Sequence, residues 1–254
     1  MKDNLFAKFG AKFELGQFYP SYERSKKAAL APPDWLVFSL KSGLGSDATN
    51  VGICYYCLGE KREAKVYGRE AVEYVLEYFY GKWRKEIKTG LGTYDPEWWR
   101  THVSWASSFS EALCWASSLG DWKSVRRLAE YPTKESKPGV DATREEAAMY
   151  VALACFLRND APNECEECFN VIQKGGNQKA KLVSEVVRAL QANDERKLQE
   201  SLKAYFEYFR KREFKRTKLS KLLCLDGTTL LNVGKRQGFD FKAPPEVEDH
   251  IIRF

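Results

Sequence analysis

Two Cys-x-x-Cys pairs have the spacing that comes closest to a known chemistry in this sequence. They are Cys54/Cys57 in "CYYC" and Cys165/Cys168 in "CEEC". Four thiolates can hold a tetrahedral zinc ion, and a single pair can carry out thiol–disulfide exchange. The two pairs lie 111 residues apart, however, which is far from the compact spacing of zinc ribbons.

Helical periodicity gives these cysteines a simpler role. Cys165 and Cys168 share a face with Phe169 and Ile172, as small core residues do. A position inside a helix lacks the turn that wraps thiolates around a metal, and no strand precedes either motif, as a thioredoxin-like site requires. We expect structural thiols, with no metal and no cofactor. The odd total of seven cysteines favours reduced thiols in a cytosol.

Groups for acid–base or nucleophilic catalysis are sparse. No local motif gives His102 a hydrogen-bonding partner, and His250 is expected at the surface. Glu145 and Glu146 are adjacent, so on a helix they point apart and suit its first turn. The Gly-rich segments lack the Gly-Lys-Ser/Thr ending of a phosphate loop. We therefore predict no catalytic residue and no enzyme, and an active site assembled from distant residues stays an open alternative.

The densest charge lies in residues 210–221. Its basic residues are Arg210, Lys211, Arg212, Lys215, Arg216, Lys218 and Lys221. Such a segment suits a phosphate backbone or an acidic protein surface, and it also suits a solvated helix end. The first six of these residues are our candidates for partner binding.

Aromatic residues supply one further candidate. In "DPEWWRTHVSW", Trp98, His102 and Trp105 share a helical face, whereas Trp99 points elsewhere. Most aromatic side chains are expected in the core. An exposed Trp99 would be a contact anchor, because tryptophan is enriched at binding hot spots.

The elements that would position these residues are pairs of helices joined by two residues. The joins are Gly120-Asp121, Asn159-Asp160 and Asn193-Asp194. The first residue can end a helix in a left-handed conformation, and the aspartate can cap the next helix. The aspartates lie 39 and 34 residues apart, a period typical of helix-pair repeats, which must stack to bury their apolar faces.

The remaining segments complete the predicted organisation. Residues 1–45 are expected to form an irregular arm, because Pro20, Pro32 and Pro33 interrupt them and "KSGLGSD" (41–47) is typical of a loop. Val72, Val75, Leu76 and Phe79 form one face of a helix. A further helix should run from Pro96 to about Leu119. We predict three helix pairs in residues 96–211 and a helical cap in residues 222–254, with a helix ending at Gly238 and a turn beginning at Pro245.

Composition bounds the class of protein. The chain has 254 residues, 44% of them apolar, and a formal net charge of +6, which fits an acidic partner or a nucleic acid. No run approaches the roughly 18 apolar residues of a membrane span, so we expect no membrane association. The N-terminal residues lack the apolar core of a secretory signal, so we predict a cytoplasmic protein.

Two resemblances refine this view. "SSLGDWKSVRRLAEYP" resembles the core of a tetratricopeptide hairpin. Together with the tail "LDGTTLLNVGKRQGFDFKAPPEVEDHII", it makes residues 96–254 resemble the all-helical immunity proteins of bacterial polymorphic toxin systems. That resemblance implies a protein that binds a cognate toxin and neutralises it by occlusion, without catalysis.

The sequence thus predicts a single all-α domain, an irregular tetratricopeptide-like array of antiparallel helical hairpins. The predicted function is non-catalytic binding of a partner protein, with toxin neutralisation as its sharpest form. The alternative is a nucleic-acid-associated helical-repeat protein that uses the basic segment 210–221.

Overall fold

A computed structural model describes residues 5–30, 37–81, 88–89, 92–93, 105–133, 142–159, 162–214 and 222–254. In these ranges the fold is all-α apart from one antiparallel pair of two-residue strands, β1 (Lys88–Thr89) and β2 (Gly92–Thr93). The helices are α1 (Leu5–Ala28), α2 (Val37–Leu58), α3 (Lys61–Tyr80), α6 (Ala106–Ser118), α7 (Trp122–Ala129), α8 (Arg144–Arg158), α9 (Pro162–Lys174), α10 (Gln178–Gln191), α11 (Glu195–Tyr208), the π-helix η1 (Phe209–Glu213), α12 (Leu225–Arg236) and α13 (Pro245–Glu248).

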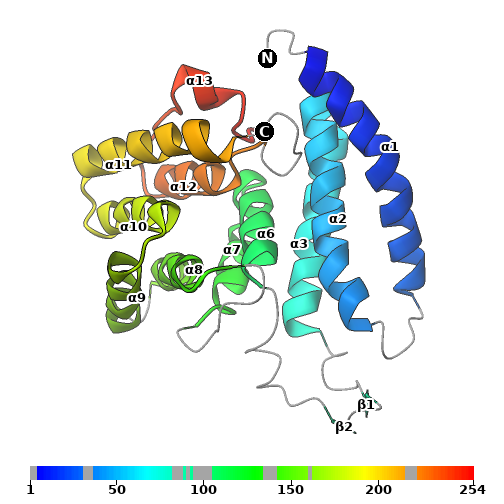
Figure 1. Ribbon diagram of the computed structural model, residues 1–254, viewed down its shortest axis with the longest axis horizontal. Coiled ribbons are helices and arrows are strands. Elements are labelled where there is room, and N and C mark those ends of the chain that lie inside the picture. The colour runs from blue at the N-terminus through cyan, green and yellow to red at the C-terminus, as the bar shows by residue number, and fades with distance from the viewer. Residues whose placement is uncertain are drawn as a thin grey trace.

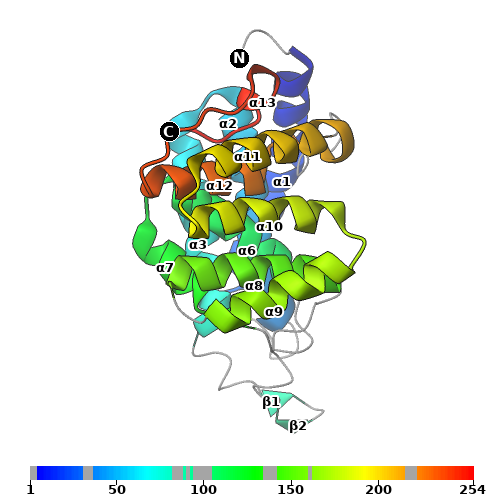
Figure 2. The same cartoon turned by 90° about the vertical axis from the view of Figure 1, so that its left-hand side faces the viewer.

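The helices form two groups of different character. The long helices α1, α2 and α3 lie side by side, and the shorter helices α6 to α13 pack on one side of them (Figure 1). Helices α6 and α7 join the groups, since both contact α3. Figure 2 shows α8, α9, α10 and α11 stacked across the face of the shorter group. Helix α12 returns to pack against α6, so that distant parts of the chain close around one core.

The predicted irregular arm at residues 1–45 is wrong, because most of it is helical. Pro20 lies inside α1, where its ring removes the usual donor to the carbonyl of Gly16. Both residues are exposed, so water can satisfy that carbonyl. Tertiary contacts hold the helix in place: Tyr22 is fully buried and hydrogen-bonds to Glu70 of α3, which also pairs with Lys26 at 2.9 Å.

The predicted loop at residues 41–47 is also wrong, because this segment lies within α2. One of its two glycines, Gly45, serves helix packing. A side chain at Gly45 would meet Val75 Cγ2 of α3 at 2.6 Å, so only glycine allows the two backbones to approach this closely. The sequence pattern marks such a glycine as a helix breaker, but packing between neighbouring helices overrides that preference.

The joins at Gly120-Asp121 and Asn193-Asp194 are confirmed, and the join at Asn159-Asp160 is confirmed at its first residue. Gly120, Asn159 and Asn193 all have positive φ, which ends the preceding helix in the left-handed conformation. Asp121 Oδ1 accepts from Ser124 N at 3.1 Å, and Asp194 Oδ1 accepts from Lys197 N at 2.9 Å. Asp160 lies outside the described residues.

The predicted apolar face of α9 is confirmed as core, because Cys165, Cys168, Phe169 and Ile172 are all buried. On α3 the predicted face is buried at Val72, Val75 and Phe79, whereas Leu76 is partly buried. Helix α12 is followed by Gly238 at positive φ, and α13 begins at Pro245, as predicted. Helix α6 ends at Ser118, close to the predicted end, but it begins at Ala106, so the prediction of one continuous helix from Pro96 is wrong. Pro96 itself lies outside the described residues.

No helix within the described ranges is both long enough and apolar enough to cross a lipid bilayer.

Candidate functional site

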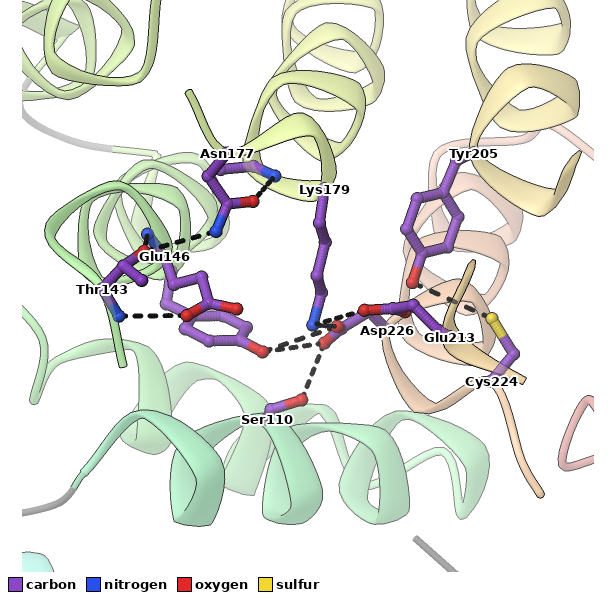
Figure 3. A network of polar contacts seen from close by, with 11 residues as sticks. Ser110, Thr143, Glu146, Asn177, Lys179, Tyr205, Glu213, Cys224 and Asp226 are labelled. Atoms are coloured by element: carbon purple, nitrogen blue, oxygen red, sulfur yellow. Dashed lines mark hydrogen bonds and ion pairs between the residues drawn. The ribbon is translucent and has the colours of Figure 1, made fainter. Parts of the chain in front are cut away.

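The first candidate site is a polar network where the N-terminal ends of α8, α10 and α12 meet (Figure 3). Lys179 is the second residue of α10, an unfavourable place for a cation because a helix N-terminus is itself positive. Asp226 is the second residue of α12, where a carboxylate is favoured. The negative charge of Asp226 therefore offsets the unfavourable position of the Lys179 ammonium at the N-terminus of α10.

The contacts of this network tie five elements together. Lys179 Nζ lies 2.7 Å from Asp226 Oδ2 and 3.8 Å from Glu213 Oε1 of η1. Ser110 of α6 donates to Asp226 Oδ1 at 2.7 Å, and the hydroxyl of Tyr150 on α8 reaches the same oxygen at 3.3 Å. We refer to Ser110, Tyr150, Lys179, Glu213 and Asp226 as the ionic brace.

Helix caps support the brace from one side. Asn177 caps α10 by accepting from Ala180 N at 3.0 Å, and its amide donates to Thr143 Oγ1 at 3.3 Å. Thr143 and Glu146 form a reciprocal capping box at the start of α8. The start of α10, and with it Lys179, is thereby fixed against α8.

Nearby charges and hydrogen bonds keep Lys179 and Asp226 of the brace ionised. Burial alone would raise the pKa of Asp226, but the Lys179 ammonium and the hydrogen bonds from Lys179, Ser110 and Tyr150 hold it below its ordinary value. Burial alone would lower the pKa of Lys179, but the Asp226 charge raises it well above its ordinary value. Burial raises the pKa of the Tyr150 hydroxyl. At neutral pH the pair is therefore charged and Tyr150 is neutral, as suits a structural ion pair rather than a general base.

A cavity of about 380 Å³ adjoins the brace. Tyr205 and Cys224 also line it, and Cys224 Sγ lies 3.8 Å from the Tyr205 hydroxyl oxygen. Burial raises the pKa of the Cys224 thiol, so this sulfur is a weak nucleophile at neutral pH.

The second candidate site is a larger cavity of about 540 Å³ lined by basic residues. It lies between α3, the α6–α7 turn, the end of α12 and residues 252–254. Among the described residues, no Asp or Glu side chain lines it. Five cationic side chains do, which are Lys65, Arg69, Lys235, Arg236 and Arg253. We refer to this cavity as the basic pocket.

Most of this charge is uncompensated. Arg253 pairs with Glu248, with its Nη2 3.2 Å from Oε2. In the described part of the chain no carboxylate pairs with Lys65, Arg69, Lys235 or Arg236. Lys65 and Arg69 are four residues apart on one helical face, where like charges repel. A cleft lined by one sign of charge concentrates the field and attracts anions.

The chain segment at residues 251–254 is held rigidly at the edge of the basic pocket. The buried hydroxyl of Tyr56 donates to Ile251 O at 2.9 Å and accepts from Arg253 N at 2.9 Å. Ile252 N donates to Thr228 Oγ1 at 3.1 Å. Figure 1 shows this end of the chain between the long helices and α12. The pocket is thus built by preorganised backbone rather than by a loose tail.

Polar and aromatic groups complete the lining. Asn232 Nδ2 donates to Ser117 Oγ at 3.3 Å and to Ser118 Oγ at 3.2 Å. The centre of the half-buried Trp122 ring lies 5.7 Å from the Arg236 guanidinium carbon, and Lys65 Nζ lies 5.0 Å from the centre of the Phe254 ring. Two aromatic rings therefore stand beside the cations.

The structure describes three of the seven predicted partner-binding residues. Arg210, Lys211 and Arg212 lie in η1 and are exposed, and Lys211 pairs with Glu207 at 2.6 Å. They line neither cavity, although their neighbours Phe209 and Glu213 line the cavity beside the ionic brace. Trp99, Lys215, Arg216 and Lys218 lie outside the described residues.

The two Cys-x-x-Cys pairs are not brought together. One lies on α2 and the other on α9, at opposite sides of the molecule (Figure 1). All seven cysteines are free and buried. Burial raises the pKa of Cys54 to about 12 and that of Cys57 to about 11. Among the described residues no group of three His, Cys, Asp or Glu side chains could hold a metal ion.

His250 is half-buried rather than fully at the surface. Its Nδ1 lies 2.7 Å from Leu222 O, so this nitrogen carries the proton and donates. Its ring centre lies 4.6 Å from that of Phe214. These contacts give it a packing role at the start of the C-terminal segment. His102 lies outside the described residues.

The sequence analysis did not predict the residues of the basic pocket or of the ionic brace as site residues. Lys65, Arg69, Lys235 and Arg236 are spread over α3 and α12, and only the fold gathers them. A local signal for the brace does exist, since "NQKAK" places Lys179 just after the cap residue Asn177. A cation there indicates a nearby carboxylate.

No family model matches this chain, and neither a curated protein nor a solved structure matches it. The class of the molecule therefore rests on its own geometry: an all-α protein with a buried ionic brace and a basic surface pocket. The resemblance to immunity proteins gains no support from the comparisons and stays a proposal.

Proposed function

We propose that this chain is a non-catalytic binding protein that captures an anionic group of its partner in the basic pocket. The observation that carries the proposal is the set of four uncompensated cations around one cavity, Lys65, Arg69, Lys235 and Arg236. Trp122 stands at the same cavity, and tryptophan and arginine are the residues most enriched at binding hot spots.

The state of the reactive groups supports binding rather than catalysis. Buried thiols with raised pKa values are poor nucleophiles, and Cys54, Cys57 and Cys155 all have them. Lys179 is held in its charged form by Asp226. In the described part of the chain, these groups are therefore poorly suited to attack a substrate or accept a proton at neutral pH.

The partner in this proposal is a protein with an acidic surface. In its sharpest form, α6 to α11 are divergent tetratricopeptide-like hairpins, and the partner is a toxin that the protein neutralises by covering it. The paired helices with left-handed joins support the hairpin part of this idea. Co-expression with the product of the adjacent gene would test the toxin part, and a toxic product that this protein fails to neutralise would contradict it.

Reversing the charge of the basic pocket should abolish partner capture. We expect the double variant R69E/K235E to lose at least tenfold in affinity for a partner isolated from the native host, because each close charge pair across an interface contributes about 1.5 kcal/mol or more. The matched control is R62E/K242E, which changes two exposed cations that do not line the pocket. Equal loss in both variants would show that only net charge matters and would remove the pocket from the proposal.

The exposed run Arg210–Arg212 favours a second candidate, association with nucleic acid. In that case the variant R210A/K211A/R212A should shift RNA or DNA less than the wild type, and binding should weaken steeply as salt rises. A mobility-shift assay at about 0.15 M salt tests this. Absence of any shift by the wild-type protein would eliminate the candidate.

A further inference from the structure

We infer that the basic pocket is a binding site for a nucleoside di- or triphosphate. The inference rests on the proposed function, since it takes this pocket to be the anion-binding site and names the anion. It is carried by three independent features of the pocket, which are its charge density, its aromatic edge and its size.

The charge of the pocket matches a chain of phosphates. Each phosphate group carries up to about two negative charges and three acceptor oxygens. Two or three linked phosphates therefore match the four uncompensated cations within one cavity. A carboxylate carries a single charge, so an acidic peptide would have to place four side chains in the same space.

The kinds of cation also suit phosphate. Arg69 and Arg236 present planar guanidinium forks that bind two phosphate oxygens at once, and Lys65 and Lys235 add point charges. Arg69 and Lys65 come from α3, whereas Lys235 and Arg236 come from the last turn of α12. Cations thus reach the cavity from two different elements, as a ligand held between them requires.

The Trp122 ring at the edge of the pocket gives a surface on which the nucleobase can stack. Trp122 is half-buried at the start of α7, beside the α6–α7 turn that lines the cavity. Nucleobases stack on indole rings, and the Arg236 guanidinium carbon, 5.7 Å from the centre of this ring, is close enough for a phosphate to reach it from a base held there. The cavity volume of about 540 Å³ lies within the range of roughly 300–1,000 Å³ that small-ligand pockets occupy.

A bound nucleotide would have a consequence for the partner. Its phosphates would neutralise the same cations that we propose for an acidic protein surface. Nucleotide and partner would therefore compete for the pocket, and the nucleotide concentration would control partner binding.

Calorimetric titration of the full chain tests the inference. The ligands are ADP, ATP, pyrophosphate, adenosine and a tetra-aspartate peptide. We expect ADP to bind about tenfold more tightly than pyrophosphate, because base stacking adds to the phosphate contacts. R69A/K235A should weaken ADP and pyrophosphate alike, by at least about tenfold. The control R62A/K242A should leave both unchanged.

A second variant separates the contribution of the nucleobase to binding from that of the phosphates. W122L keeps an apolar side chain, so that α7 stays packed, but it removes the ring. It should weaken ADP about tenfold and leave pyrophosphate unchanged, with the melting temperature showing that the fold is kept. Retention of the wild-type ADP affinity in W122L, or equal binding of ADP and pyrophosphate by the wild type, would overturn the nucleotide assignment.

The remaining outcomes distinguish this inference from the proposed function. If the tetra-aspartate peptide binds in the pocket and no phosphate compound does, the nucleotide site is wrong and anion capture stands. If neither the peptide nor any phosphate compound binds, both are wrong.

Discussion

Replacing Asp226 by asparagine is expected to lower the free energy of unfolding by about 3 kcal/mol, because it removes one partner of a buried ion pair. The side chains of Lys179 and Asp226 are only 12% and 11% exposed, so the ammonium that is left without its carboxylate is largely buried. The ammonium keeps Glu213, but at 3.8 Å rather than 2.7 Å. Urea unfolding of both proteins at pH 7 measures the difference.

The same variant should change the response to acid. The folded-state pKa of Asp226 is below its ordinary value, so its contribution is complete above about pH 4 and is lost as the pH falls through the lower folded-state value. The raised pKa of Lys179 gives a contribution that is complete below about pH 10.4 and is lost only at higher pH. The difference between wild type and D226N should therefore shrink in acid below about pH 4. It should also shrink in alkali, because Lys179 of D226N lacks the Asp226 charge that opposes the pKa-lowering effect of burial.

Two comparisons isolate the ion pair. D240N removes an exposed carboxylate and should leave stability unchanged. K179M/D226L replaces both charges by apolar groups and should be more stable than D226N, since no charge is left buried alone. A D226N protein as stable as the wild type would show that the brace contributes nothing to folding.

The sequence predicts the helix pairs well because their signals are local. A residue at positive φ, followed by a capping aspartate, acts within two or three positions, and Gly120-Asp121 and Asn193-Asp194 form the joins expected. The apolar faces that follow are also set by local spacing. Nothing beyond the segment itself is needed to place these turns.

The sequence fails where neighbouring helices decide the structure. Pro20 and Gly45 have local preferences against helix, yet both lie inside long helices. Tyr22 and Glu70, far apart in sequence, hold α1 in place, and Val75 leaves room only for a glycine at position 45. These partners follow from tertiary packing, which a periodicity analysis does not include.

The basic pocket could not be predicted from the sequence for a similar reason. The basic run 210–221 is dense in sequence, whereas Arg69 and Lys235 are single cations on separate helices. A window along the chain finds the first kind of cluster and misses the second. Uncompensated charge becomes visible only when the fold shows which carboxylates are within reach.

Trp115 should contribute more to stability than any exposed residue of the chain, because it joins the two groups of helices. Its indole packs against Gly68 of α3, and a Cβ at Gly52 of α2 would lie 2.8 Å from its Cζ2. The ring of Phe254 stacks on the indole, with 6.1 Å between the two ring centres. No acceptor in the described residues reaches its Nε1, so its contribution comes from packing rather than from a hydrogen bond.

We therefore expect W115A to lower the free energy of unfolding by about 4 kcal/mol, the usual cost of an aromatic cavity. G68A should cost about 2 kcal/mol in the wild type, since its methyl group overlaps the indole ring, although alanine favours helix more than glycine. In the W115A background that overlap is gone, so G68A should cost nothing or stabilise the protein.

The control is G43A in α2, where an added Cβ meets no atom within 4 Å and no loss is expected. Thermal and urea unfolding of the four proteins in the cycle give the coupling between positions 68 and 115. Simple additivity of G68A and W115A would mean that the two positions do not touch. The long helices and the shorter ones would then be held together by other contacts.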